Sequence, residues 1–132
     1  MPHYIYNGQD NKPDFAPRGE YIGTIVWAKD KTTDWGEEIS VLFAFDGDRG
    51  SAFDNLQFQE AKQWKIDVFL KATGHTPKDG PGAEVELTAK MVKGWRAWLD
   101  IGVEDDRKVE GKKKNVILKY LPEKGVPEPL PF

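Results

Sequence analysis

Aromatic and cationic side chains are the groups in this sequence whose types and spacing most clearly point to chemistry. The 132 residues include five Trp, seven Phe and four Tyr, a supply that leaves rings to spare once one domain's core is filled. Exposed rings can stack on nucleobases, each stack contributing about 1–3 kcal/mol whatever the base, while Lys and Arg bind phosphate oxygens. Outward rings flanked by cations would therefore form a surface for single-stranded nucleic acid.

Groups suited to catalysis are sparse. The chain has no Cys, and so no thiol nucleophile, disulfide or thiolate metal site. His3 and His75 fall in segments expected to be flexible, and neither Ser40 nor Ser51 has an evident base. No Gly-rich phosphate loop of the GxxxxGK type occurs. The sequence therefore predicts a protein that is not an enzyme and that needs no cofactor or metal.

One weak alternative is a Mg²⁺-dependent nuclease. Asp54 followed by Glu60 and Lys62 resembles a set in which acids hold the metal and Lys assists the nucleophile. The pair Glu60 and Lys62 opens an expected helix, where an acidic first turn is ordinary. We therefore expect a structural role for these residues.

The elements that must position the rings are mostly strands. Period-two alternation and β-rich composition predict strands over residues 20–29, 37–45, 51–58, 84–92, 95–101 and 116–121. Residues 30–36 and 103–115 read as polar loops. Over residues 59–73 the period changes to that of a helix ending at Gly74. Its expected buried stripe is Ala61, Trp64, Val68, Phe69 and Ala72.

Three strands, a helix and further strands predict an all-β domain with one helix, an OB-type Greek-key barrel with the helix between strands three and four. A sandwich would need about seven strands and no such helix. Residues 1–19 would form an arm, pinned by Tyr4, Ile5, Tyr6 and Phe15; residues 20–121 the nucleic-acid-binding domain; and residues 122–132, with four Pro, a flexible tail.

Alternation along the strands selects the candidate stacking residues. Phe53 should point outward beside Asn55, and Trp98 outward beside Arg96. Trp35 would stand at the tip of the first loop. The open alternatives are contact of Phe53 with the N-terminal arm, packing of Trp98 on the helix or a dimer partner, and folding of Trp35 back onto the barrel. The remaining Trp residues, Trp27, Trp64 and Trp95, are expected in the core.

The candidate phosphate contacts are lysines and one arginine. Lys29, Lys31, Lys90, Lys93 and Arg96 could follow a phosphate backbone, and Lys112, Lys113 and Lys114 could form a flexible clamp. The alternative for the triple Lys is a solvated loop balanced by neighbouring acids. The formal net charge of −3 argues against nucleic acid, although residues 84–120 carry more basic than acidic side chains.

Several short stretches together resemble a known family. They are Pro17-Arg18-Gly19-Glu20-Tyr21, Ile39-Ser40-Val41-Leu42-Phe43, Phe53-Asp54-Asn55-Leu56 and the segment from Asn115 to Tyr120. Their order resembles that of small OB-fold single-stranded DNA-binding proteins of bacteriophages and prophages. The resemblance implies a viral DNA replication or DNA recombination protein that coats single-stranded DNA in the host cytoplasm.

The C-terminal end resembles the tips of bacterial single-strand binding proteins. It reads Pro129-Leu130-Pro131-Phe132, and the family tip also finishes in Pro-Phe, whose ring and carboxylate partner enzymes bind in a basic pocket. That resemblance implies recruitment of replication or recombination proteins through Pro131 and Phe132. The family tip has several Asp, whereas only Glu123 and Glu128 stand here, and a frayed Pro-rich end is the alternative.

The rival class of function is protein binding. An OB-type barrel that binds a protein and no DNA would fit the net charge of −3, and exposed strands could pair in a homodimer. No apolar run approaches the ~20 residues needed to span a bilayer, and the N-terminal residues do not read as a signal peptide. We therefore expect a cytoplasmic protein without a membrane partner.

Overall fold

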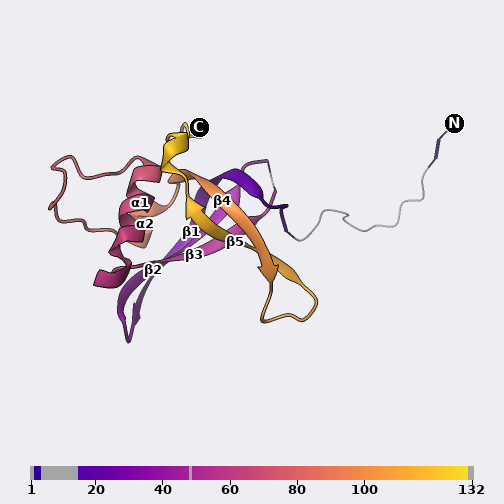
Figure 1. Cartoon of the computed structure of the whole chain (residues 1–132), viewed down its shortest axis with the longest axis horizontal. Coiled ribbons are helices and arrows are strands. Elements are labelled where there is room, and N and C mark those ends of the chain that lie inside the picture. Colours follow the sequence, from indigo (N-terminus) through magenta and orange to yellow (C-terminus); the bar gives the residue numbers. More distant parts are fainter. Residues whose placement is uncertain (1, 4–14, 48, 131–132) are drawn as a thin grey trace.

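The computed structural model describes residues 2–3, 15–47 and 49–130, and within them five strands form one antiparallel sheet. The strands are β1 (Gly19–Thr33), β2 (Gly36–Phe45), β3 (Ser51–Gln57), β4 (Arg96–Asp105) and β5 (Lys113–Tyr120), in the order β3-β2-β1-β4-β5. The helices are η1 (Glu60–Lys62), α1 (Gln63–Thr73), α2 (Ala89–Val92) and η2 (Pro122–Lys124). Figure 1 shows the strands wrapping around one another beside α1.

The sheet is nearly closed into a barrel, because β3 and β5, its two edges, also lie beside each other. The helix α1 follows β3, precedes β4 in the chain and contacts β3, β4 and β5. This arrangement confirms the predicted all-β, OB-like fold with its helix between strands three and four. Across the same chain no described helix has the length and apolar composition of a membrane span.

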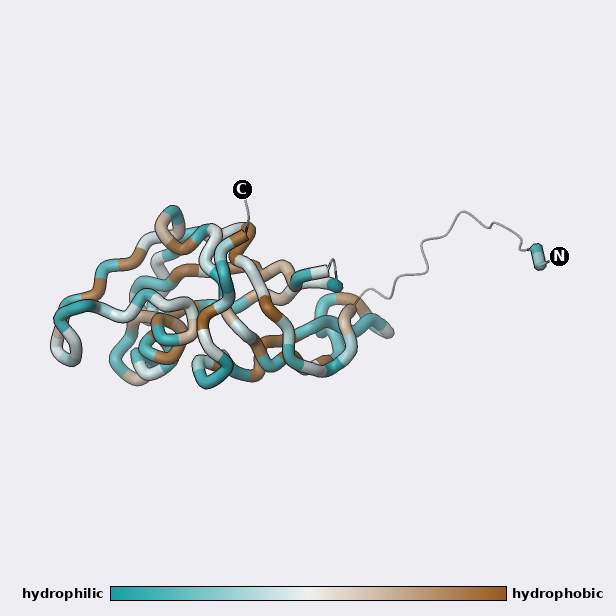
Figure 2. The backbone as a smooth tube through the Cα atoms, turned by 90° about the horizontal axis from the view of Figure 1, so that it is seen from above, coloured by the Kyte–Doolittle hydropathy of each residue, from teal (hydrophilic) through white to brown (hydrophobic). Residues whose placement is uncertain are grey.

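The core lies between the inner face of the barrel and α1. Its largest fully buried side chains include Phe43, Phe69 and Leu99. Tyr120 joins Phe43 and Phe69 through ring contacts of 6.0 and 5.5 Å between centroids. In Figure 2 hydrophobic stretches run through the body, and hydrophilic ones form several outlying loops. The rings therefore connect β2, α1 and β5 into one packed unit.

Gly23 marks the closest approach of the central strands. A Cβ built at this position would lie 2.6 Å from Leu99 Cδ1 and 3.0 Å from Phe43 Cδ1. Both neighbours are fully buried core residues. Only a residue without a side chain therefore allows β2 and β4 to pack this tightly against β1.

A bulge in β1 changes which residues face outward. Ile25 pairs with Phe43 but Trp27 pairs with Leu42, so Val26 is an extra residue in the strand. Ile25 is buried, whereas Trp27 is 40% exposed. The expectation that Trp27 belongs to the core is therefore wrong, because the bulge directs its side chain to the outer surface.

Two predicted loops contain strand. Residues 30–36 were expected as a loop, but β1 continues to Thr33 and β2 begins at Gly36, so only Asp34 and Trp35 form the turn. The predicted loop 103–115 likewise shrinks to residues 106–112 between β4 and β5. Polar residues are compatible with these extensions, since antiparallel strands tolerate a face that is exposed to water.

The predicted strand over residues 84–92 is wrong. Its first part has no regular structure, and residues 89–92 form α2. Thr88 caps this short helix, because its side-chain oxygen accepts a 3.2 Å hydrogen bond from the Met91 N–H. The local cap and the helix-favouring Ala, Lys and Met override the alternating pattern.

The predicted buried stripe of the helix is partly wrong. The side chains of α1 that face the core are Ile66, Phe69, Leu70, Ala72 and Thr73. Trp64 is instead 65% exposed, and Ala61 is exposed in η1. Positions 66, 69, 70 and 73 form a regular i, i+3, i+4, i+7 stripe that places Trp64 on the outer side. Gly74 ends the helix in a left-handed conformation, as predicted.

Both ends of the barrel chain are anchored. Asn115 donates to the Ala16 carbonyl at 2.8 Å and accepts from the Ala16 N–H at 2.7 Å, which fixes the end of the arm. Phe15 is half-buried, while Tyr4, Ile5 and Tyr6 lie outside the described residues. On the C-terminal side, Arg96 donates to the Glu128 carbonyl at 2.8 Å. The described part of the tail therefore lies against β4.

Candidate nucleic-acid interface

The outer face of β1, β2 and β3 carries a row of apolar side chains. Trp27 pairs with Leu42, and Leu42 pairs with Phe53, so the three residues lie side by side across the strands. The rings of Trp27 and Phe53 meet edge to face, with centroids 6.0 Å apart. Phe53 is 65% exposed, so this row offers two rings to a ligand, and the predicted outward direction of Phe53 is confirmed.

Polar and cationic side chains continue this outer face toward the hairpin end. The next row is Lys29, Ser40 and Asn55, followed by Lys31, Glu38 and Gln57. Ser40 Oγ donates to Asn55 Oδ1 at 2.6 Å, which leaves the Asn55 amide NH₂ as a donor toward a ligand. Gln57 Nε2 contacts Glu38 Oε2 at 3.5 Å. Lys29 and Lys31 are exposed, so two cations follow the two rings.

Trp35 stands at the tip of the β1–β2 hairpin and is 79% exposed. Thr33 Oγ1 accepts from the Trp35 N–H at 3.2 Å and donates to the Gly36 carbonyl at 2.9 Å. Gly36 has φ +124°, which an L side chain rarely adopts. The turn is thus held by local hydrogen bonds, and the Trp35 ring does not fold back onto the barrel.

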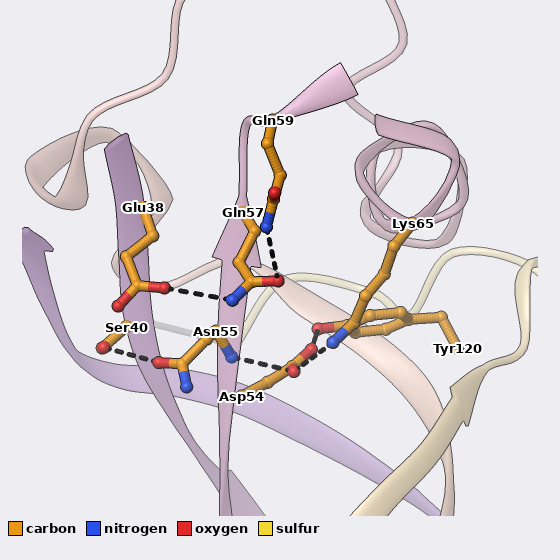
Figure 3. A network of polar contacts seen from close by, with 8 residues as sticks. All are labelled: Glu38, Ser40, Asp54, Asn55, Gln57, Gln59, Lys65 and Tyr120. Carbon is orange, nitrogen blue, oxygen red and sulfur yellow. Dashed lines mark hydrogen bonds and ion pairs between the residues drawn. The ribbon is translucent and has the colours of Figure 1, made fainter. Parts of the chain in front are cut away.

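Asp54 points to the side of β3 opposite Phe53 and Asn55, where it bonds to α1 and β5 (Figure 3). Its carboxylate accepts hydrogen bonds from Lys65 Nζ of α1, from the Tyr120 hydroxyl of β5 and, at 2.8 Å, from the Asn55 N–H. Burial, followed by the charge of Asp54, raises the pKa of Tyr120 well above its ordinary value. This network closes the gap between β3 and β5.

The same network bears on the nuclease alternative. The Asp54 carboxylate accepts hydrogen bonds from Lys65, Tyr120 and the Asn55 N–H, and its ion-pair partner is Lys65. In the part of the chain that the structure describes, no group of three or more His, Asp or Glu side chains is arranged to hold a metal ion. The partner of Asp54 from the helical segment is Lys65, and not Glu60 or Lys62 of the nuclease alternative.

Trp98 and Arg96 lie on β4, away from the ring pair. Lys124 Nζ sits 4.3 Å from the Trp98 ring centroid, and the ring is half-buried. The Arg96 guanidinium forms an ion pair with Asp46 and also binds the tail at Glu128. Both residues point outward on β4, but Trp98 contacts Lys124 of η2 and Arg96 binds the tail, so neither joins the ring pair on β1 and β3.

The remaining predicted cations divide into two groups. Lys113 and Lys114 extend from β5 and pair with Asp105 at 3.5 Å and with Glu104 at 3.7 Å, while Lys112 lies in the exposed loop before them. These pairs agree with the solvated, charge-balanced alternative. In Figure 1 this loop and the β1–β2 tip both extend from the side away from the C-terminus. The loops between strands one and two and between strands four and five take part in ligand binding in OB folds.

Lys90 and Lys93 are exposed beside β1. Lys90 lies within α2 and Lys93 follows it. This helix contacts β1 and β2, and the Ala89 N–H donates to Asp30 Oδ1 at 2.9 Å. Gly94, next to Lys93, donates to the Ile25 carbonyl at 2.8 Å, directly before the bulge. Lys93 thus flanks the Trp27 end of the outer face.

Sequence reasoning missed Trp27 and the apolar row around it. The signal was present, because β1 reads as apolar on both sides while the chain has one long helix to cover them. Comparison of the chain with protein-family models and with curated proteins finds no match. The functional assignment therefore depends on the fold and on the chemistry of this outer face.

Proposed function

We propose that this protein binds single-stranded DNA, with little sequence preference, across the outer face of β1, β2 and β3. The observation that carries the proposal is the exposed pair of Trp27 and Phe53. Exposed large rings are costly in water unless a ligand covers them. Stacking on such rings accepts every base, because every base has a flat π-surface. Strands two and three of OB folds are also the usual location of such sites.

The charges near the rings support a polyanionic ligand. Lys29 and Lys31 point outward in the rows beside Phe53, and exposed Lys93 precedes Gly94, which bonds to β1 at Ile25. The acid in these rows is Glu38, and the neutral Gln57 amide that contacts it does not offset its charge, so the rows carry two cations against one acid. Because the net charge of the whole chain is −3, attraction must come from this local cluster. Binding should therefore weaken steeply as salt rises, since phosphate contacts release counterions.

The tail is proposed to recruit replication or recombination proteins. Its last residues, Pro131 and Phe132, lie outside the described residues, so the support is the sequence resemblance alone. The tail is fastened at Glu128 by Arg96, on a different strand from the ring pair. Deletion of Pro131 and Phe132 should therefore leave DNA affinity unchanged or higher and abolish partner recruitment.

A fluorescence titration with oligo-dT at two salt concentrations tests DNA binding. We expect quenching of Trp emission at low salt and a large loss of affinity at high salt. Phe53→Ala and Phe53→Leu should both weaken binding about 5-fold or more, because neither retains the ring. Lys29→Gln and Lys31→Gln should reduce the salt dependence, whereas Lys71→Gln, on the far part of α1, is the matched control. Unquenched emission at low salt would refute the proposal.

The second candidate is a protein-binding module, which the net charge of −3 favours. Val26, next to Trp27 in the chain, is 55% exposed at the bulge and adds an apolar side chain to the surface of β1, and apolar surface of this kind also suits a protein partner. Its signature would be absent oligonucleotide binding together with self-association that Phe53→Asp abolishes. Sedimentation of the wild type and of Phe53→Asp without DNA distinguishes protein binding from DNA binding.

A further inference from the structure

A second surface with an exposed ring and cations lies beyond the β3 edge, between α1 and β5. It is a groove of about 280 Å³ between α1 and β5. Trp64 and Leu118 stand on its walls and are 65% and 58% exposed. Lys62, Lys65 and Lys119 also line it, and Gln57 forms its border toward β3. None of these groove residues except Gln57 belongs to the outer face defined above.

The charge of this groove is positive. Lys65 is paired with Asp54, so its charge is matched. Lys62 and Lys119 are exposed, and among the described residues neither has an ion-pair partner within 4.0 Å. The cross-strand neighbour of Lys119 is Asp100, which does not come within that distance either. Two unmatched cations beside an exposed indole favour an anionic ligand that has a flat ring.

The groove is continuous with the outer face. Gln57 occupies the last outward position of β3, in the row with Lys31 and Glu38, and it also lines the groove. Figure 3 shows Asn55 and Gln57 on one side of β3, with Lys65 and Tyr120 on the other, and Asp54 between them. A ligand that crosses Phe53 and Asn55 toward Gln57 would next meet the Lys65 end of α1.

We propose that the groove between α1 and β5 is an extension of the DNA site, with Trp64 as a second stacking platform and with Lys62 and Lys119 as phosphate contacts. This inference rests on the proposed function of the outer face. The bound strand runs from Trp27 and Phe53 past Gln57, around the β3 edge and onto α1. A single OB barrel binds from about 4 to 16 nucleotides, and the extension places this protein toward the long end of that range.

The test compares two oligo-dT lengths by fluorescence anisotropy of a label on the DNA. One has about 5 nucleotides and the other about 16, which bracket the range of an OB fold. Trp64→Ala should weaken binding of the long oligonucleotide about 5- to 100-fold, the effect of one stacked base, and change the short one less than about twofold. Trp64→Phe retains a ring and should restore most of the loss. Lys62→Gln and Lys119→Gln should weaken the long complex, and Lys71→Gln should not.

The outcomes separate this inference from the function on which it rests. If Phe53→Ala weakens binding at both lengths and Trp64→Ala matches the wild type at both, the groove is not part of the site and the inference is overturned. If the wild type binds neither oligonucleotide at low salt, the proposed function fails and the inference fails with it. If the wild type instead binds an acidic peptide that Trp64→Ala releases, the groove is a protein site and the inference is equally overturned.

Discussion

Replacement of Asp54 by Ala should destabilise the barrel more than the replacement of any other Asp or Glu among the described residues. Asp54 connects β3 to α1 through Lys65 and to β5 through Tyr120. Its side chain is 10% exposed and that of Lys65 is 32% exposed, while Tyr120 is buried. The substitution therefore removes the polar bonds that hold the two edges of the sheet together.

The expected loss follows from what is left without a partner. The Tyr120 hydroxyl would be a buried donor with no acceptor, which costs about 1–3 kcal/mol. The Lys65 ammonium can turn to water, so losing its ion pair adds about 1 kcal/mol at most. The free energy of unfolding of Asp54→Ala should then be lower by about 1–4 kcal/mol in total. Urea denaturation followed by Trp fluorescence at neutral pH measures it.

A double-mutant cycle isolates the cause. Tyr120→Phe removes the hydroxyl, so adding it to Asp54→Ala should recover about 1 kcal/mol or more relative to Asp54→Ala alone. Asp105→Ala, whose carboxylate is 88% exposed and pairs with Lys113, is the matched control and should change stability by less than about 0.5 kcal/mol. If Asp54→Ala lies within that margin as well, or if the double variant is no better than the single, the proposed role of the network is wrong.

Three further predictions follow from the structure. Because burial and Asp54 raise the pKa of Tyr120, the unfolded chain loses this proton first above about pH 10, and stability should fall by up to about 1.4 kcal/mol per pH unit. Urea midpoints measured across that range should fall less steeply in Tyr120→Phe, and equal slopes would contradict the assignment. Gly23→Ala should lower stability by about 1–3 kcal/mol, since its methyl would overlap Leu99; an unchanged thermal midpoint would show that the neighbours yield freely. Trp35→Ala should leave thermal stability nearly unchanged and weaken oligo-dT about 5-fold or more, whereas wild-type affinity would remove the hairpin tip from the site.

The fold could be predicted from the sequence because its two strongest patterns are local. Alternation in residues 37–45 and 51–58 and the helix that ends at Gly74 are each set by neighbours in the chain, and each was found close to its predicted bounds. The failure over residues 84–92 has a local cause too, since four residues with a Thr88 cap are too few to show a helical period.

The candidate site was harder to predict because exposure depends on contacts distant in sequence. Phe53 was placed correctly by alternation alone. Trp98 faces away from the core as alternation requires, but Lys124 and the tail cover it. The Arg96 guanidinium likewise forms an ion pair with Asp46, fifty positions earlier in the chain. Trp64 was misplaced because two candidate stripes compete on α1, and only packing against the barrel selects the one through Ile66 and Phe69.

The extra residue at Val26 divides β1 into two parts in which opposite sets of residues, even-numbered and odd-numbered, face outward. Before it, the even-numbered residues Ile22 and Thr24 pair with outward positions of the neighbouring strands; after it, the odd-numbered Trp27 and Lys29 do. The part of β1 before Val26 pairs with β4, and the part after it contributes to the surface proposed to hold DNA. An alignment that treats β1 as an uninterrupted strand would assign the wrong face to one of its halves, and with it would hide one of the two central rings of the site.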